Sequence, residues 1–144
     1  MRVVIQRVLE SSVLVEGQNV GRINKGLNIL VGFTDGDTVD SIHKMIDKIL
    51  KLRIFDDENH IMNKSIIDIN GSILLISQFT LYADTRKGNR PSYVNALNSH
   101  DASILYQTMV DLLKTKIHTE QGVFGADMKV NIVNDGPVTI CMES

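Results

Sequence analysis

Apolar side chains recur along the chain at two periods, which together predict helices packed on a sheet. A first helix is predicted after Asp37 or Thr38, either of which suits an N-cap, because apolar residues recur there every three or four positions. Its apolar face comprises Val39, Ile42, Met45, Ile46, Ile49 and Leu50. A second helix is predicted after Asn98 or Ser99. Its apolar face comprises Ile104, Leu105, Met109, Leu112 and Leu113.

Shorter apolar or alternating runs predict the strands. Residues 3–8 suggest a first strand, and residues 13–15 and 19–23 a hairpin. Residues 26–33 are almost continuously apolar, which is typical of a central strand covered on both faces. Residues 66–69 are expected to lead through a hairpin-type turn at Asn70-Gly71 into a strand that ends at Ser77. The runs 129–133 and 138–142 predict a last hairpin, closed by residues 134–137.

These elements predict the fold class and the domain organisation. The chain is expected to be α+β, with a mostly antiparallel or mixed, barrel-like sheet and two long amphipathic helices packed on it. Its 144 residues are enough for one domain with a real core, so we expect a single domain over residues 1–144.

Composition and charge narrow the functional classes. The net charge of −2 means that any affinity for nucleic acid must come from a local patch. The single cysteine, Cys141, excludes an intrachain disulfide, favours a reducing compartment, and is expected to be a buried apolar residue. No apolar run approaches the roughly 20 residues of a membrane span, and we expect no signal peptide, because the apolar run in residues 1–7 is too short for one. We therefore expect a cytoplasmic protein without a membrane partner.

The candidate chemistry begins where the strand before Ser77 ends. Ser77, Gln78 and Thr80 offer hydroxyl and amide groups at the strand exit, and a loop with three cations follows, with Gly88 as its turn. The cations are Arg86, Lys87 and Arg90. Such a strand end could hold a phosphate-bearing substrate, although an ordinary strand followed by a solvated turn has the same composition.

The sequence does not contain the usual catalytic motifs. None of the four histidines is near Ser77, Thr80 or Cys141 in sequence, and Gly-rich phosphate loops, CxxC and HExxH motifs are absent. The acidic run 56–59 with His60 is more typical of a solvated turn than of a metal site. We therefore expect no cofactor and no metal, and an enzyme would rely on backbone donors, hydroxyls and groups of its substrate.

Four ordered motifs identify a family resemblance. They are residues 77–81, residues 83–88 with Arg90-Pro91, residues 125–128, and residues 134–139. Together they resemble the D-aminoacyl-tRNA deacylase family, also called D-tyrosyl-tRNA deacylases. Residues 2–8, 52–55 and 62–65 are similar to the same family, so the resemblance runs through the whole chain.

The resemblance implies a homodimeric tRNA-editing hydrolase that binds the aminoacylated acceptor end of tRNA. It would cleave the ester of D-aminoacyl-tRNA and of mischarged glycyl-tRNA, and would reject L-aminoacyl-tRNA. Gly136-Pro137 would be a cis pair that enters the partner subunit's pocket, receives the substrate's α-ammonium and leaves no room for an L side chain. Arg7 would help to hold this pair in place.

The resemblance also implies roles for the other motifs. Ser77 and Gln78 would shape the pocket, and backbone N–H groups of Phe79 and Thr80 would stabilise the oxyanion, where one lost donor typically costs about 3–4 kcal/mol. The ribose 2′-hydroxyl of the substrate would help to activate water. Met128 would pack on the terminal adenine. The cations Arg86, Lys87 and Arg90 would meet acceptor-end phosphates.

Two other readings use the same residues. A general esterase would act on small acylated alcohols. A non-catalytic dimer would bind RNA ends or nucleotides through the basic loop. DNA is not an expected partner.

Overall fold

One long strand organises the sheet. β1 (Arg2–Val15) pairs antiparallel with β3 (Gly26–Gly32) along its first half and with β2 (Gln18–Ile23) along its second half. Its other edge pairs antiparallel with β8 (Met128–Glu143). β3 continues in parallel to β6 (Ser72–Ser77), which pairs in parallel with β7 (Thr119–Gln121). The computed structural model describes all residues, 1–144.

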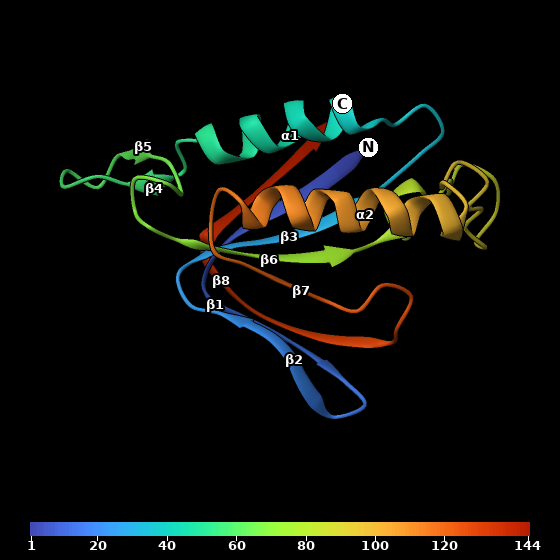
Figure 1. Ribbon diagram of the computed structural model, residues 1–144, viewed down its shortest axis with the longest axis horizontal. Coiled ribbons are helices and arrows are strands. Elements are labelled where there is room, and N and C mark those ends of the chain that lie inside the picture. The colour runs from blue at the N-terminus through green and yellow to red at the C-terminus, as the bar shows by residue number, and fades with distance from the viewer.

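The sheet curls until its two ends approach each other. Its strand order is β2-β1-β3-β6-β7, and β2 and β7 come close without pairing. An ideal Cβ on Gly21 of β2 would lie 2.9 Å from the carbonyl oxygen of Gln121 in β7, so glycine permits this approach. A mixed, nearly closed sheet results (Figure 1), which confirms the predicted fold class.

Two helices cover one face of the sheet, as Figure 1 shows for α1 (Val39–Lys51) and α2 (Ser99–Lys114). Thr38 caps α1, because its side chain accepts a hydrogen bond from the Ser41 N–H while the Ser41 hydroxyl accepts one from the Thr38 N–H. Asn98 caps α2 by accepting a hydrogen bond from the Asp101 N–H. Both predicted helix starts are confirmed. Neither helix has the length and apolar character that a membrane span requires.

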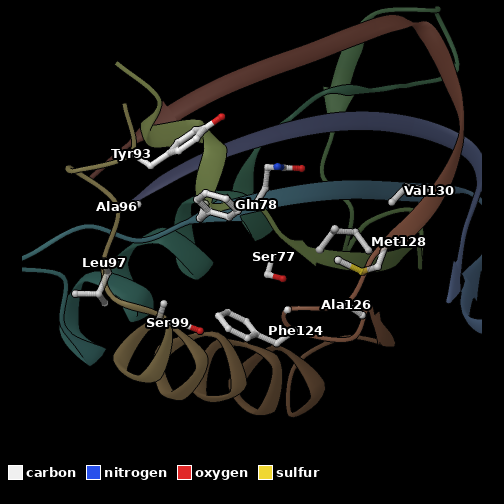
Figure 2. Close-up of a pocket in the computed structure, with 14 residues that line it drawn as sticks. Ser77, Gln78, Tyr93, Ala96, Leu97, Ser99, Phe124, Ala126, Met128 and Val130 are labelled. Carbon is white, nitrogen blue, oxygen red and sulfur yellow. The ribbon is translucent and has the colours of Figure 1, made fainter. Parts of the chain in front are cut away.

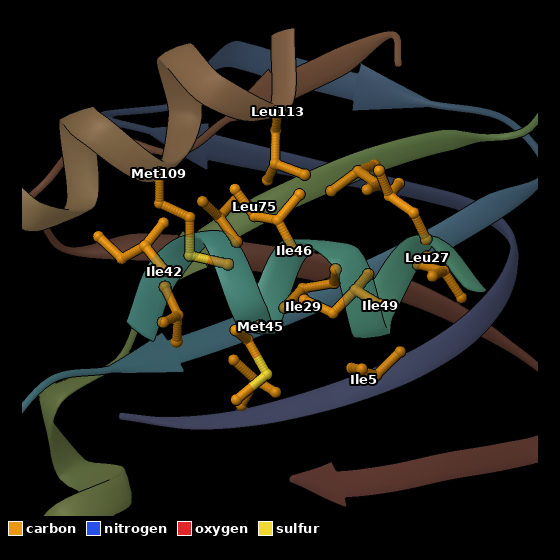
Figure 3. Close-up of a cluster of buried hydrophobic side chains, with 14 of the residues drawn as sticks. Ile5, Leu27, Ile29, Ile42, Met45, Ile46, Ile49, Leu75, Met109 and Leu113 are labelled. Carbon is orange, nitrogen blue, oxygen red and sulfur yellow. The ribbon is translucent and has the colours of Figure 1, made fainter. Parts of the chain in front are cut away.

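The main core lies between the helices and the sheet (Figure 3), where 22 buried residues form one cluster. Ile42, Ile46 and Ile49 of α1 contribute to it, as predicted. A smaller cluster of five residues fills the opposite side of the sheet, inside the curl: Val8, Val13, Ile23, Leu74 and Ile76. β3 is therefore covered on both faces, as its continuous apolar run predicts.

The predicted buried face of α2 is partly wrong. Met109 and Leu113 are buried, but Ile104 is 53% exposed and Ala102 and Tyr106 take its place in the core. The Tyr106 hydroxyl donates a hydrogen bond to the Leu75 carbonyl (2.8 Å). Tyr106 can therefore be buried in the core although it carries a polar group, which the apolar periodicity does not predict.

Three further predictions are wrong. Residues 66–69 form a turn rather than a strand, because the Ser65 hydroxyl donates to the Asp68 carboxylate, and β6 pairs in parallel with β3. Residues 134–137 do not close a hairpin, because β8 runs along β1 from end to end. Cys141 is exposed, since β8 is an edge strand whose alternate side chains point away from the core.

The remaining elements are short. β4 (Phe55–Asp56) and β5 (Met62–Lys64) form a separate two-stranded ribbon. The 3-10 turn η1 (Phe79–Tyr82) follows β6 and begins the site described below.

Candidate active site

A cavity of about 570 Å³ opens at the end of β6. Fourteen residues line it, ten of them hydrophobic, and they come from three segments: the end of β6 with η1, residues 93–102, and residues 124–130. Figure 2 shows Ser77 in the middle of this space, with Leu97, Ser99 and Phe124 to one side of it. A mostly apolar cavity with a few polar groups is the usual form of a small-molecule site.

The chain turns sharply where β6 ends. The Gln78 N–H donates to the Val31 carbonyl (2.7 Å), which continues the parallel pairing by one residue before η1 begins. Phe79 and Thr80 are the first residues of η1, so their N–H groups have no acceptor within that turn and no other backbone or side-chain partner. The strand end therefore offers two free N–H donors.

Three of the four residues predicted at the strand exit line the cavity: Ser77, Gln78 and Phe79. Thr80 is not among the lining residues, and its hydroxyl accepts a hydrogen bond from the Gln78 side-chain amide. The Thr80 hydroxyl is thus paired with the Gln78 amide, a contact suited to positioning that side chain.

Met128 also lines the cavity, on the side formed by β8 (Figure 2). A Cβ on Gly122 would lie 2.5 Å from the Met128 sulfur, so glycine is needed there for the thioether to reach its place. Met128 and Ser77 thus line the same cavity, and the adenine contact of Met128 stays a prediction.

The lining contains no general acid or base in the usual sense. It includes no histidine, cysteine, carboxylate, lysine or arginine, and Tyr93 is its only titratable side chain. No group of three or more histidine, cysteine or acidic side chains is placed to hold a metal ion. Within this chain, the polar groups that the cavity offers are therefore hydroxyls, the Gln78 amide and backbone groups.

The basic loop is a closed structure. Two backbone hydrogen bonds join Asp84 to Ser92 (2.7 and 3.0 Å), and Gly88 makes the turn with a φ of +70°. Arg86 is bound to Asp84 through Nε (2.9 Å) and an Nη atom (2.7 Å), which lowers the pKa of the Asp84 carboxyl. Lys87 and Arg90 are exposed and have no carboxylate partner. Only part of the predicted basic patch is thus free.

Gly136 and Pro137 lie far from this lining in the sheet. Gln6 pairs with Thr139 and Val8 pairs with Asn134, so Arg7 alone faces residues 135–138. β8 therefore bulges outward, the Gly136-Pro137 peptide bond is cis, and both residues are exposed. Neither of them lines the cavity of its own chain.

Arg7 holds this bulge from beneath. Its guanidinium is buried and donates to the Ile54 carbonyl (2.8 Å), and Nε lies 3.1 Å from an Asp135 carboxylate oxygen, an ion-pair distance without hydrogen-bond geometry. The Asn134 side-chain amide donates to the Arg7 carbonyl (2.9 Å) and to the Val138 carbonyl (3.1 Å). These contacts join the two ends of the bulge, Asn134 and Val138, to each other and to β1.

Sequence reasoning missed several of these residues. The motif at residues 134–139 gives no separate role to Asn134 and Asp135, although their side chains hold the bulge. Tyr93, Ser99 and Phe124 line the cavity from segments that looked ordinary. Their contribution depends on tertiary proximity, for which the sequence carries no local signal.

The fold and the site define a class: small α+β proteins with a nearly closed mixed sheet and an apolar cavity at a strand end. The family model for D-Tyr-tRNA(Tyr) deacylase matches residues 4–143. The chain therefore belongs to the D-Tyr-tRNA(Tyr) deacylase family, whose members are hydrolases of aminoacyl-tRNA esters, so the predicted enzyme class is confirmed.

Two curated relatives bear the name D-aminoacyl-tRNA deacylase. The protein of Clostridium botulinum (strain 657 / Type Ba4) is 52% identical over 145 residues, and that of Clostridium novyi (strain NT) is 50% identical. In both cases the alignment covers 100% of this chain and 97% of the relative. The likeness therefore extends over the whole length of this chain.

Two solved structures share the fold. One, described as c-Myc DNA Unwinding Element Binding Protein, has a TM-score of 0.94 at 39% identity and covers 100% of this chain and 99% of that one. The other, described as a probable eukaryotic D-amino acid tRNA deacylase, has a TM-score of 0.84 at 17% identity, with 98% and 97% covered. At that identity the second likeness concerns the fold alone.

Proposed function

We propose that this protein is a homodimeric editing hydrolase that cleaves D-aminoacyl-tRNA into free D-amino acid and tRNA. The observation that carries the proposal is the separation of two motifs within one chain: Gly136-Pro137 is exposed on an edge strand and does not line the cavity at Ser77 of its own chain. A second copy would bring its Gly136-Pro137 to that cavity. Family membership and relatives named D-aminoacyl-tRNA deacylase support the reaction.

The edge strand supports dimerisation. β8 pairs only with β1, so the 16 residues of β8 leave the main-chain groups of one edge without a strand partner. Long unpaired edges of this kind are usually covered in native proteins. In the dimer, each cavity would be completed by the partner subunit.

Selection would work by exclusion. The substrate's α-ammonium would be received by the carbonyl oxygens of the Gly136-Pro137 pair, and the Cβ of an L-residue would then collide with the same backbone. A steric penalty of this kind can reject one enantiomer although both have the same atoms and charge. Glycine, which has no Cβ, would pass, so glycyl-tRNA would also be cleaved.

Hydrolysis would proceed without a protein nucleophile. The ester carbonyl would lie at the strand end, where N–H groups of Phe79 and Thr80 would stabilise the oxyanion. Water would attack the carbonyl carbon, assisted by the neighbouring ribose 2′-hydroxyl, and the bond to the ribose oxygen would break. Ser77 and Gln78 would orient the acyl group, Met128 would pack on adenine, and Lys87 and Arg90 would meet phosphates in the cytoplasm, where charged tRNA is found.

A second candidate is nucleic-acid binding without hydrolysis, which the description of the 39% identical structure as a DNA-element binding protein favours. A general esterase is the other alternative. One experiment separates the three: incubate the protein with D-tyrosyl-tRNA and with a small chromogenic ester. Release of D-tyrosine without turnover of the chromogenic ester supports the proposal. Fast chromogenic turnover favours the esterase, and tRNA retention with the acyl group intact favours the binding protein.

A further inference from the structure

An exposed pair of aromatic rings stands at the mouth of the cavity. Phe79 is 56% exposed and Tyr93 is 41% exposed, although both contribute to the cavity lining. Their ring centroids are 5.1 Å apart at an interplanar angle of 68°, an edge-to-face arrangement. The two rings therefore support each other while roughly half of each side chain remains open to solvent, so a ring face can still take a stacking partner.

The backbone fixes Tyr93 in place from both sides. Immediately before it, Ser92 is joined to Asp84 by two backbone hydrogen bonds. Immediately after it, the Tyr93 carbonyl accepts a hydrogen bond from Ala96 N–H (2.9 Å), and Leu97 N–H donates to the Phe33 carbonyl (2.9 Å). Tyr93 is therefore a positioned side chain rather than part of a free loop.

The same segment carries positive charge. Residues 84–92 leave and return at the Asp84–Ser92 bridge, directly beside Tyr93, and Lys87 and Arg90 lie on that loop without carboxylate partners. Aromatic surfaces next to unpaired cations are the combination that binds single-stranded nucleic acid, because bases stack on the rings while cations meet phosphates. In Figure 2, Tyr93 and Met128 lie at opposite ends of the cavity. A strand leaving the cavity on the Tyr93 side would meet the ring before the cations.

We infer that Tyr93, supported by Phe79, stacks on the unpaired nucleobase that precedes the terminal adenosine of the substrate. This inference rests on the proposed function and adds a second nucleotide subsite to it. The subsite makes the enzyme prefer an acyl group on a nucleotide strand over the same acyl group on free adenosine. It reads the presence of a base, not its identity, because every base has a stacking face.

The test compares D-tyrosyl esters of adenosine and of the dinucleotide cytidylyl-adenosine, at low and high salt. Wild-type protein is expected to prefer the dinucleotide ester in kcat/KM by roughly tenfold, the usual scale of one base–aromatic stack. Tyr93→Ala is expected to remove most of this preference, while Tyr93→Phe keeps it. Val94→Ala is the matched control, because Val94 is 81% exposed but does not line the cavity, and it should keep the preference.

Three results would overturn the inference. Tyr93→Ala with an unchanged preference removes the ring from the subsite. A preference that disappears at high salt in the wild type assigns the gain to a phosphate contact. A dimer that dissociates in Tyr93→Ala, measured by sedimentation, assigns the aromatic pair to a second copy of the chain.

The proposed function can fail separately. If no ester is cleaved, calorimetric binding of unacylated adenosine and cytidylyl-adenosine still decides the inference. Tighter dinucleotide binding by the wild type than by Tyr93→Ala supports the stacking subsite, and equal binding by both overturns it.

Discussion

Gly136→Ala tests whether the bulge of β8 is the element that selects the substrate. Gly136 has a φ of +114°, where an L side chain is strained, and such backbone strain costs about 1–3 kcal/mol. The added Cβ would also lie 2.9 Å from a Val138 methyl group, 3.2 Å from the Val138 nitrogen and 3.1 Å from an Arg7 Nη atom. The Val138 nitrogen belongs to the backbone and the Arg7 side chain is buried, so neither can move without shifting the bulge.

The substitution therefore has two measurable consequences. If the bulge keeps its shape, the free energy of unfolding falls by about 2 kcal/mol, which corresponds to a Tm roughly 4–8 °C lower at fixed protein concentration. If the bulge relaxes, the selecting carbonyl groups move, and the ratio of D-tyrosyl-tRNA to L-tyrosyl-tRNA hydrolysis falls. Thermal unfolding and parallel deacylation of the two tRNAs measure both effects in the same preparation.

Gly17→Ala is the matched control for backbone strain. Gly17 has a φ of +78°, and a Cβ there would meet no atom within 4 Å. It should lose about 1 kcal/mol of stability and keep the D-to-L ratio. A Gly136→Ala protein with the wild-type Tm and the wild-type ratio would refute the reasoning, because the bulge would then tolerate a side chain and select nothing.

Three further substitutions test other parts of the account. Thr80→Ala should lower the single-turnover rate constant by about tenfold or less, because the Thr80 N–H remains, and Thr80→Ser should restore the rate. Complete loss of activity would instead make the hydroxyl the attacking group. Lys87→Ala should lower the slope of log affinity against log salt for tRNA by about 0.7–0.9, and Arg86→Ala should lower it less, because Arg86 is paired with Asp84; equal slopes would contradict this difference. Tyr106→Phe should lower the free energy of unfolding in urea by about 1–2 kcal/mol, because the Tyr106 hydroxyl donates a hydrogen bond to the buried Leu75 carbonyl. The ratio of D-tyrosyl-tRNA to L-tyrosyl-tRNA hydrolysis should stay unchanged, and an altered ratio would give Tyr106 a part in substrate selection.

Local sequence patterns predict best those elements that bury a single regular stripe of apolar residues. The helix over Val39–Lys51 follows directly from its spacing, since every residue that it buries belongs to the predicted stripe. α2 is less predictable because apolar residues lie on more than one side of it. Its true face contains Ala102 and Tyr106, which a face built from Ile, Leu and Met alone leaves out.

The bulge of β8 shows why the hairpin predicted at residues 134–137 was wrong. Residues 134–137 contain turn-forming residues, and local chemistry alone favours a hairpin there. The structure instead keeps one strand, because β1 offers a long continuous edge and Arg7 fills the space beneath the extra residues. Pairing partners far apart in sequence decided the outcome.

The candidate site likewise contains residues that the sequence predicts and residues that only the fold brings together. Ser77, Gln78 and Phe79 were predicted from one contiguous segment and lie together at the cavity. Tyr93 and Phe124 reach that cavity from segments that are distant in sequence, and only the fold brings them there. The partner's contribution to the cavity stays a prediction of the proposed dimer.

The most direct test of the central claim is parallel deacylation of one tRNA charged with D-tyrosine or with L-tyrosine. The account predicts rapid release from the D-form while the L-form stays intact. Equal release from both would leave an esterase without a chiral selector. Release from neither, with tRNA still bound, would contradict the proposed function itself.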